Sequence, residues 1–189
     1  GSEMMVTKKS RTWALAEAAE VAEDLIRLLG PDCDRIEIAG SVRRCKPNVG
    51  DIELLVIPKT APTDTLWLDR TPLDKRILEF MVDGILDYRL NKKGIRTYGR
   101  LNKLLIHVPS GIGVDLFSTT AENWGMSLVV RTGPAEFCVK MMSRFRALGL
   151  KGHAYGGVED PLGTQLPCPT EEEVFRLARC SYIPPEKRF

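Results

Sequence analysis

Two carboxylates, Asp51 and Glu53, stand two residues apart at the start of an apolar run over 51–57. Successive strand side chains point to opposite faces, so we expect both carboxylates on one face and Ile52 in the core. Clustered carboxylates are costly unless they are exposed or hold cations. Such oxygen ligands suit Mg²⁺, which binds through a few carboxylates together with substrate phosphates. The pair therefore predicts a magnesium site for phosphoryl or nucleotidyl transfer.

Two further segments could complete this site. The turn Gly40-Ser41 stands upstream of the carboxylates and could offer backbone N–H groups and a hydroxyl to a phosphate. A third acid, Asp115, lies in another apolar stretch, 113–118. If that stretch is a strand beside the first, Asp115 completes a set of three carboxylates.

The apolar periodicity predicts an α+β fold around these residues. We expect helices over 10–30, capped by Ser10, and over 72–83, with Pro72 in the first turn. A weaker helical pattern covers 41–46. Strands are expected over 35–40, 51–58, 86–91, 102–108 and 113–118. After residue 120 we expect a helix over 134–148, a loop or hairpin over 150–168, and a short helix Val174–Arg179 that follows a capping box at Thr170.

Composition favours an ordinary globular protein. The 189 residues are 43% hydrophobic and 28% charged, with a net charge of +2, which alone does not argue for nucleic acid. The sequence shows no run of 18 or more apolar residues and no signal-peptide pattern. The five cysteines are scattered without C-x-x-C spacing, which argues against a zinc site or disulfide framework. We expect a cytoplasmic monomer, bacterial or viral, with no membrane partner, and a tag remnant within the tail 1–9.

The order of these motifs resembles the DNA polymerase X family, the polymerase beta-like nucleotidyltransferases. The matching residues, in chain order, are Gly40-Ser41, Arg43-Arg44, Gly50-Asp51, Glu53, Asp115, Thr132-Gly133 and the tail from Tyr182 to Arg188. Glu53 stands where the family pattern has a second Asp. The resemblance covers nearly the whole chain after residue 10.

The resemblance implies a nucleotidyltransferase palm over 10–120, a mixed β-sheet with helices on one face. A small α+β thumb over 121–189 would contact nucleotide and duplex. The lyase and helix-hairpin-helix region of larger relatives has no counterpart here, so we expect a minimal palm-plus-thumb form similar in layout to small viral members. Such a form would lack deoxyribose-phosphate lyase activity.

The resemblance also implies roles for individual residues. Asp51 and Glu53 would bind two Mg²⁺ ions, with Mn²⁺ as an alternative, and Asp115 would bind one of them. The nucleotide would be held by Gly40, Ser41, Arg44 and Gly50 at its phosphates, and by Arg131, Thr132 and Gly133 at its base and sugar. Nucleic-acid contacts are expected from Arg43, Lys92, Lys93, Lys140 and Arg144, although Arg43 could instead orient the loop and the others could be solvated surface charges.

The implied activity is template-directed DNA polymerisation of the repair type, which fills short gaps with a nucleoside triphosphate on primer-template or gapped DNA. Alternatives are a terminal or RNA-directed nucleotidyltransferase that accepts ribonucleotides without a template, and an inactive polymerase that scaffolds DNA ends. The three acids argue against the scaffold.

Three details of the chain bear on these expectations. Val130-Arg131 replaces an aromatic pair of the family, which leaves the choice of sugar open. Gly113 stands where a basic residue is common, so the position of Asp115 must come from elsewhere. The bond Gly133-Pro134 is expected to be cis, as in the family, or a trans bond at a helix start.

Overall fold

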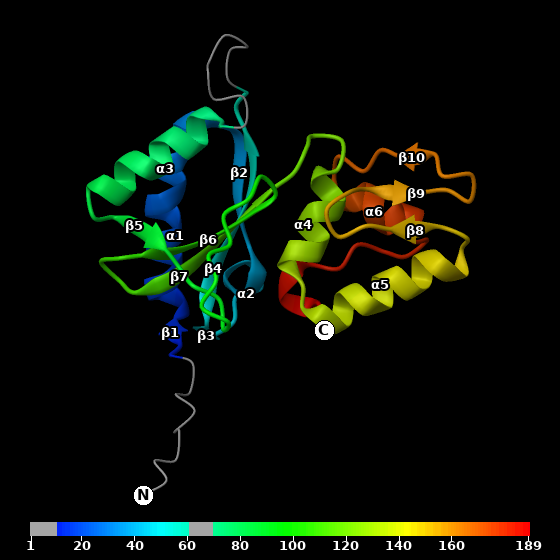
Figure 1. The fold of residues 1–189 in the computed structure, drawn as a ribbon. Helices are drawn as coiled ribbons and strands as arrows, with labels where there is room; N and C mark the ends of the chain where they lie inside the picture. Colours follow the sequence, from blue (N-terminus) through cyan, green and yellow to red (C-terminus); the bar gives the residue numbers. More distant parts are fainter. Residues whose placement is uncertain (1–10, 61–69) are drawn as a thin grey trace, which may run out of the picture.

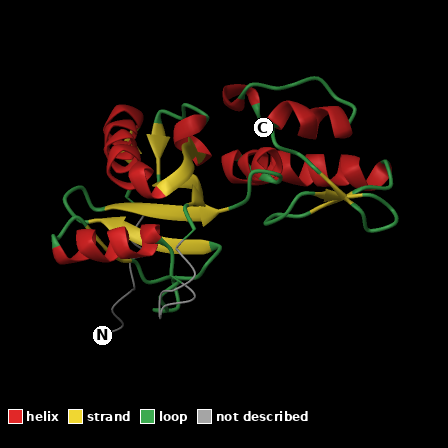
Figure 2. Ribbon diagram, turned by 90° about the horizontal axis from the view of Figure 1, so that it is seen from above, coloured by secondary structure: helices red, strands yellow, loops and turns green. Residues whose placement is uncertain are grey.

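The computed structural model describes residues 11–60 and 70–189, which form two lobes side by side (Figures 1 and 2). We call the lobe up to residue 120 the palm and the lobe from residue 121 the thumb, after the expectation from the sequence. The predicted tail 1–9, the predicted cap Ser10 and most of the polar connection after residue 58 lie outside the described residues. No helix in the described ranges is long and apolar enough to cross a membrane.

The palm is built on a mixed five-stranded sheet, as predicted. Its strands are β2 (Cys33–Ala39), β4 (Asp51–Pro58), β5 (Leu86–Tyr88), β6 (Asn102–His107) and β7 (Ile112–Ser118). They lie in the order β2-β4-β7-β6-β5. The central neighbours β4 and β7 run parallel, and the other pairs are antiparallel. This pairing brings the two acid-bearing strands together at the middle of the sheet.

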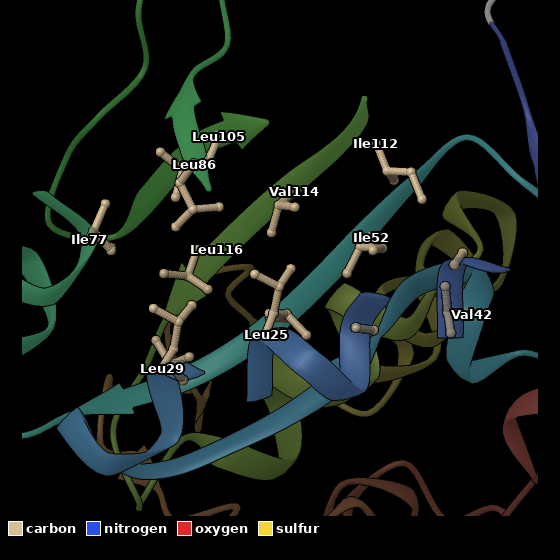
Figure 3. Packing of buried hydrophobic residues seen from close by; sticks show 14 of the residues in the cluster. Leu25, Leu29, Val42, Ile52, Ile77, Leu86, Leu105, Ile112, Val114 and Leu116 are labelled. Atoms are coloured by element: carbon tan, nitrogen blue, oxygen red, sulfur yellow. The ribbon is translucent and has the colours of Figure 1, made fainter. Parts of the chain in front are cut away.

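Helices α1 (Leu15–Leu29) and α3 (Pro72–Val82) cover one face of this sheet (Figure 1). Leu25 and Leu29 of α1 pack over Ile52, Val114 and Leu116 in the main hydrophobic core (Figure 3). Because strand side chains alternate, the residues between these apolar positions point to the opposite face. The helices thus determine that the carboxylates of β4 and β7 face away from the main core.

The N-terminal helix is shorter than predicted. Trp13 and Ala14 form a short strand, β1 (Trp13–Ala14), paired antiparallel with β3 (Asn48–Val49), so α1 begins only at Leu15. Trp13 is 7% exposed and belongs to the main core, and this burial outweighs the helical pattern. The helical pattern over 41–46 also shrinks to the single turn α2 (Gly40–Arg43), which ends before the left-handed Cys45.

The thumb contains α4 (Trp124–Thr132), α5 (Ala135–Ala147), α6 (Glu171–Leu177) and a small antiparallel sheet of β8 (Lys151–Gly152), β9 (Val158–Glu159) and β10 (Gln165–Leu166). A single turn of 3-10 helix, η1 (Gly30–Asp32), follows α1 in the palm. A second, η2 (Pro185–Lys187), follows α6 in the thumb. The thumb has its own core around Met126, Phe137, Phe145 and Phe175. The expected helix 134–148 and hairpin are present, and α6 begins three residues earlier than expected, directly after its N-cap Thr170.

Helix α4 was not predicted. Seven of its nine residues are buried, so its sequence lacks the alternation of apolar and polar faces that marks a surface helix. Its Trp124 and Leu128 pack on Leu55 and Phe117, on the sheet face opposite α1. Helix α4 therefore joins the thumb to the carboxylate face of the palm.

The close approach of α4 to the segment before α6 gives a prediction about stability. The amide of Gly125 donates to the Cys168 carbonyl at 2.8 Å, and a Cβ at Gly125 would lie 2.7 Å from that oxygen and overlap the Thr170 carbonyl. Gly125→Ala should therefore lower the free energy of unfolding by about 2–3 kcal/mol in urea titrations. Gly99→Ala is the control, because its Cβ would make only an ordinary 3.7 Å contact. Equal stability of the two variants would contradict this packing.

Candidate active site

The three predicted acids meet on the sheet face opposite α1. In the parallel pairing of β4 with β7, Glu53 lies opposite Asp115 and Asp51 lies opposite Gly113. One carboxylate oxygen from each of Asp51, Glu53 and Asp115 lies within 4.8 Å of the other two. Among the described residues this is the one such group of His, Cys, Asp or Glu side chains, and we call it the acid cluster.

Gly40 allows the neighbouring turn to approach the acid cluster. It begins α2 with a left-handed backbone, at φ +61°, which disfavours a side chain. A Cβ at Gly40 would also lie 2.7 Å from Oε2 of Glu53. Gly40 therefore lies against Glu53 of the acid cluster, and this close approach together with the left-handed backbone requires glycine at position 40.

The acid cluster is short of positive charge. Burial raises the pKa of Glu53 to about 7, and the charges of Asp51 and Asp115 add to this, while Arg131 and Arg44 oppose it. Burial and Asp51 raise the pKa of Asp115 to about 6, against the opposing effect of Arg89. A group of hard oxygen donors that resists ionisation without a counter-charge fits the binding of divalent cations such as Mg²⁺.

The predicted phosphate and sugar residues are brought together from palm and thumb. Arg44, which follows α2, donates from Nη1 to the carbonyl oxygen of Thr132 at 2.5 Å. The next residue, Gly133, ends α4 with φ +65°, and a Cβ there would lie 3.2 Å from Arg44 Nη1. The Gly133-Pro134 bond is cis, which confirms that prediction. Gly50 is exposed and directly precedes Asp51 of β4, and a Cβ at Gly50 would meet open space.

Arg131 lies between aromatic rings from both domains. Its guanidinium carbon is 4.0 Å from the centre of the Phe117 ring in the palm and 4.5 Å from that of Tyr155 in the thumb. The charge of Arg131 also acts to lower the pKa of Glu53, against the larger effect of burial. Arg131 is one of the two residues that replace the aromatic pair of the family, which is the pair expected to influence the choice between deoxyribose and ribose.

Arg43 joins the domains through a buried carboxylate. It donates to Thr132 Oγ1 at 2.8 Å and to both oxygens of Glu171 in α6, at 2.5 and 2.9 Å. Glu171 also accepts from Arg188 at 2.7 Å, and Arg188 is 1% exposed. Arg43 is therefore engaged in the contact between palm and thumb, which matches the alternative that it orients the loop; a contact with nucleic acid stays a prediction.

The other predicted nucleic-acid residues fall into two groups. Lys92 and Lys93 are exposed in the connection between β5 and β6. Arg144 donates to the carbonyls of Ala178 and Arg179 after α6, at 2.5 and 2.7 Å, and Lys140 donates to that of Phe189 at 3.3 Å. Arg144 and Lys140 thus already bind backbone oxygens within the thumb.

Two residues of the site were not predicted from the sequence. Glu171 was taken only as part of a helix N-terminus, because a run of three glutamates gives no sign that the first is buried between two arginines. Arg89 donates to Asp115 from the end of β5. One indication in the sequence that another residue binds Asp115 was Gly113, which stands where a basic residue is common in the family.

Comparison with known proteins bears on the thumb. Residues 127–189 match the family model of the DNA polymerase beta thumb. This range lies within the segment expected to be the thumb, and the match supports the resemblance to the DNA polymerase X family. It indicates a nucleotidyltransferase of the polymerase X type that binds DNA. A search of curated proteins found no match to the chain.

The raised pKa of Glu53 gives a pH dependence of stability. The unfolded chain releases this proton near the ordinary value of 4.5, whereas the folded protein holds it to about 7. Because the folded state binds more protons between these values, Glu53 lowers the free energy of unfolding as pH rises through that range. Without divalent ions, Glu53→Gln should gain on the order of 1–3 kcal/mol over wild type at pH 8 and much less at pH 4.5. The same difference at both pH values, from thermal melting in EDTA, would contradict this environment.

The buried Glu171 gives a prediction for the contact between the domains. Glu171→Gln leaves two arginines without their carboxylate, which should cost about 3–5 kcal/mol of unfolding free energy in urea titrations. The neighbouring Glu172→Gln is the matched control, since Glu172 is exposed, and should change stability by less than about 0.5 kcal/mol. If both substitutions cost the same, the ion pairs do not hold the domains together.

Proposed function

We propose that this polymerase X-type nucleotidyltransferase is a template-directed DNA polymerase of the repair type, which adds a nucleotide from a deoxynucleoside triphosphate to a primer 3′-OH and fills short gaps. The observation that carries the proposal is the convergence of the acid cluster with thumb residues, where Arg44 of the palm binds the carbonyl of Thr132 at 2.5 Å. A polymerase binds a nucleoside triphosphate and a DNA duplex. It therefore needs carboxylates for the reacting phosphate and a second domain that contacts the base and the duplex.

Asp51, Glu53 and Asp115 would hold two Mg²⁺ ions, which when bound neutralise charge on the attacking and leaving oxygens. Ser41 and Arg44 then bind the triphosphate, with the planar guanidinium suited to phosphate oxygens. The hydrogen bond from Arg44 to the Thr132 carbonyl fixes the direction of the guanidinium, which supports this assignment. Arg131, Thr132 and Gly133 would lie beside base and sugar; of these, Thr132 is buried and its hydroxyl accepts from Arg43, so Arg131 would supply the side-chain contact.

DNA would be bound mainly through its phosphates, and therefore without sequence preference and with strong dependence on salt. Lys92 and Lys93, exposed beside β5, are the predicted palm contacts whose side chains face solvent. Lys140 and Arg144 would reach phosphates only in addition to the carbonyls they already bind.

The test is single-nucleotide addition to a labelled duplex with a one-nucleotide gap. Asp51→Asn removes one charge from the acid cluster and should lower the rate by at least about a thousandfold, since such sites supply several kcal/mol of transition-state stabilisation. Asp87→Asn is the matched control, because Asp87 is an exposed acid on β5 of the same sheet, and should keep the wild-type rate. Equal rates for wild type and Asp51→Asn would overturn the assignment of the acid cluster.

Changing the template base opposite the gap separates the proposed function from its alternative. A polymerase adds the matching deoxynucleotide at each of the four templates. A terminal or RNA-directed nucleotidyltransferase adds nucleotides regardless of the template base and accepts ribonucleotides. Parallel reactions with each ribonucleotide also measure the sugar preference imposed beside Arg131.

A further inference from the structure

The position of Arg89 follows from the register of three strands. Its amide N–H donates to the Leu104 carbonyl of β6 at 3.2 Å, which continues the pairing of β5 with β6. Leu104 in turn lies opposite Asp115 of β7. Residues in one row across a sheet point to the same face. Arg89 and Asp115 therefore share the sheet face opposite α1, with one strand between them.

The side chain of Arg89 spans that intervening strand. Its Nη2 donates to Oδ1 of Asp115, and the two side chains are 27% and 13% exposed. An ionised carboxylate accepts hydrogen bonds at both oxygens, so the other oxygen of Asp115 stays available as a ligand.

Gly113 leaves the space through which this guanidinium reaches Asp115. A Cβ at Gly113 would overlap Nη1 of Arg89 and lie 3.0 Å from its Cζ. Gly113 is a buried residue of a central strand without a positive φ, so its backbone conformation does not require glycine. Glycine inside a strand weakens the strand and often marks the close approach of another group. Here that group is the guanidinium of Arg89.

We propose that Arg89 is the positioning residue of Asp115 in the acid cluster, and that it can act there only because residue 113 is glycine. The inference rests on the proposed function, in which Asp115 is an ion ligand. Arg89 holds one oxygen of Asp115 and so orients the other toward the ion. Its charge also offsets part of the repulsion among the three acids.

Four variants separate position from charge. Gly113→Ala keeps every charge but displaces the end of the flexible Arg89 side chain, so the fold should tolerate it. Arg89→Ala removes the guanidinium, and the double variant combines both changes. The swap variant, Arg89→Ala with Gly113→Arg, returns a guanidinium to the same face. Arg27→Ala, an exposed site on α1, controls for the loss of one positive charge.

Loss of a group that orients a metal ligand typically costs about 10–100-fold in metal affinity or activity. We expect each single variant to lower kcat by about 10–100-fold while KM for the nucleotide changes less than about twofold, because Asp51 and Glu53 remain. The double variant should match the single variants, since both changes break one interaction. The swap variant should recover a large part of kcat, and Arg27→Ala should equal wild type.

A second readout does not depend on activity. Binding of Mn²⁺ to the protein without nucleotide, followed by the electron paramagnetic resonance signal of the free ion, should weaken about tenfold in Gly113→Ala. Unchanged Mn²⁺ affinity and unchanged kcat in Gly113→Ala would overturn the role of Arg89, as would multiplied losses in the double variant. A wild-type protein that binds Mn²⁺ but adds no nucleotide would instead overturn the proposed function.

Discussion

Repulsion among three carboxylates is the constraint on which this structure depends. The parallel pairing of β4 with β7 places Glu53 opposite Asp115, and α1 on the other face leaves these side chains no alternative direction. Like charges in partly buried surroundings raise one another's pKa, so the site needs positive charge. Guanidinium groups supply part of it: Arg89 binds Asp115, and the effects of Arg44 and Arg131 reach Glu53. The remaining deficit is what would draw divalent cations.

The same positive side chains connect the acid cluster to the thumb. The charge of Arg44 acts to lower the pKa of Glu53, and its guanidinium donates to the Thr132 carbonyl. Its neighbour Arg43 donates to the Thr132 hydroxyl and to Glu171. Two consecutive arginines, the last residue of α2 and the one after it, therefore both donate hydrogen bonds to Thr132 of the thumb. The hydrogen bond from Arg44 thus links the Thr132 carbonyl of the thumb to a guanidinium whose charge acts on Glu53.

The parts of this arrangement that local sequence patterns determine could be predicted. The alternation around Asp51 and Glu53 predicted strand β4 at its observed bounds, and Pro72 marked the start of α3. Helix α4 was not predicted, because it is buried nearly all round and so lacks a polar face. The start of the predicted N-terminal helix is instead a strand, in which Trp13 is buried. The roles of Arg89 and Glu171 were not predicted, because their partners are distant in sequence. The register of the sheet brings Arg89 to Asp115, and the packing of the thumb on the palm brings Glu171 to Arg43.

Crystals grown with Mn²⁺, gapped DNA and a non-hydrolysable deoxynucleoside triphosphate would test the central claim most directly. Anomalous scattering locates Mn²⁺ independently of any assumption about the site. The account predicts two ions against Asp51 and Glu53, one of them also bound by Asp115, with the triphosphate at Ser41 and Arg44. Ions bound elsewhere, or a triphosphate that lies away from the acid cluster, would contradict it.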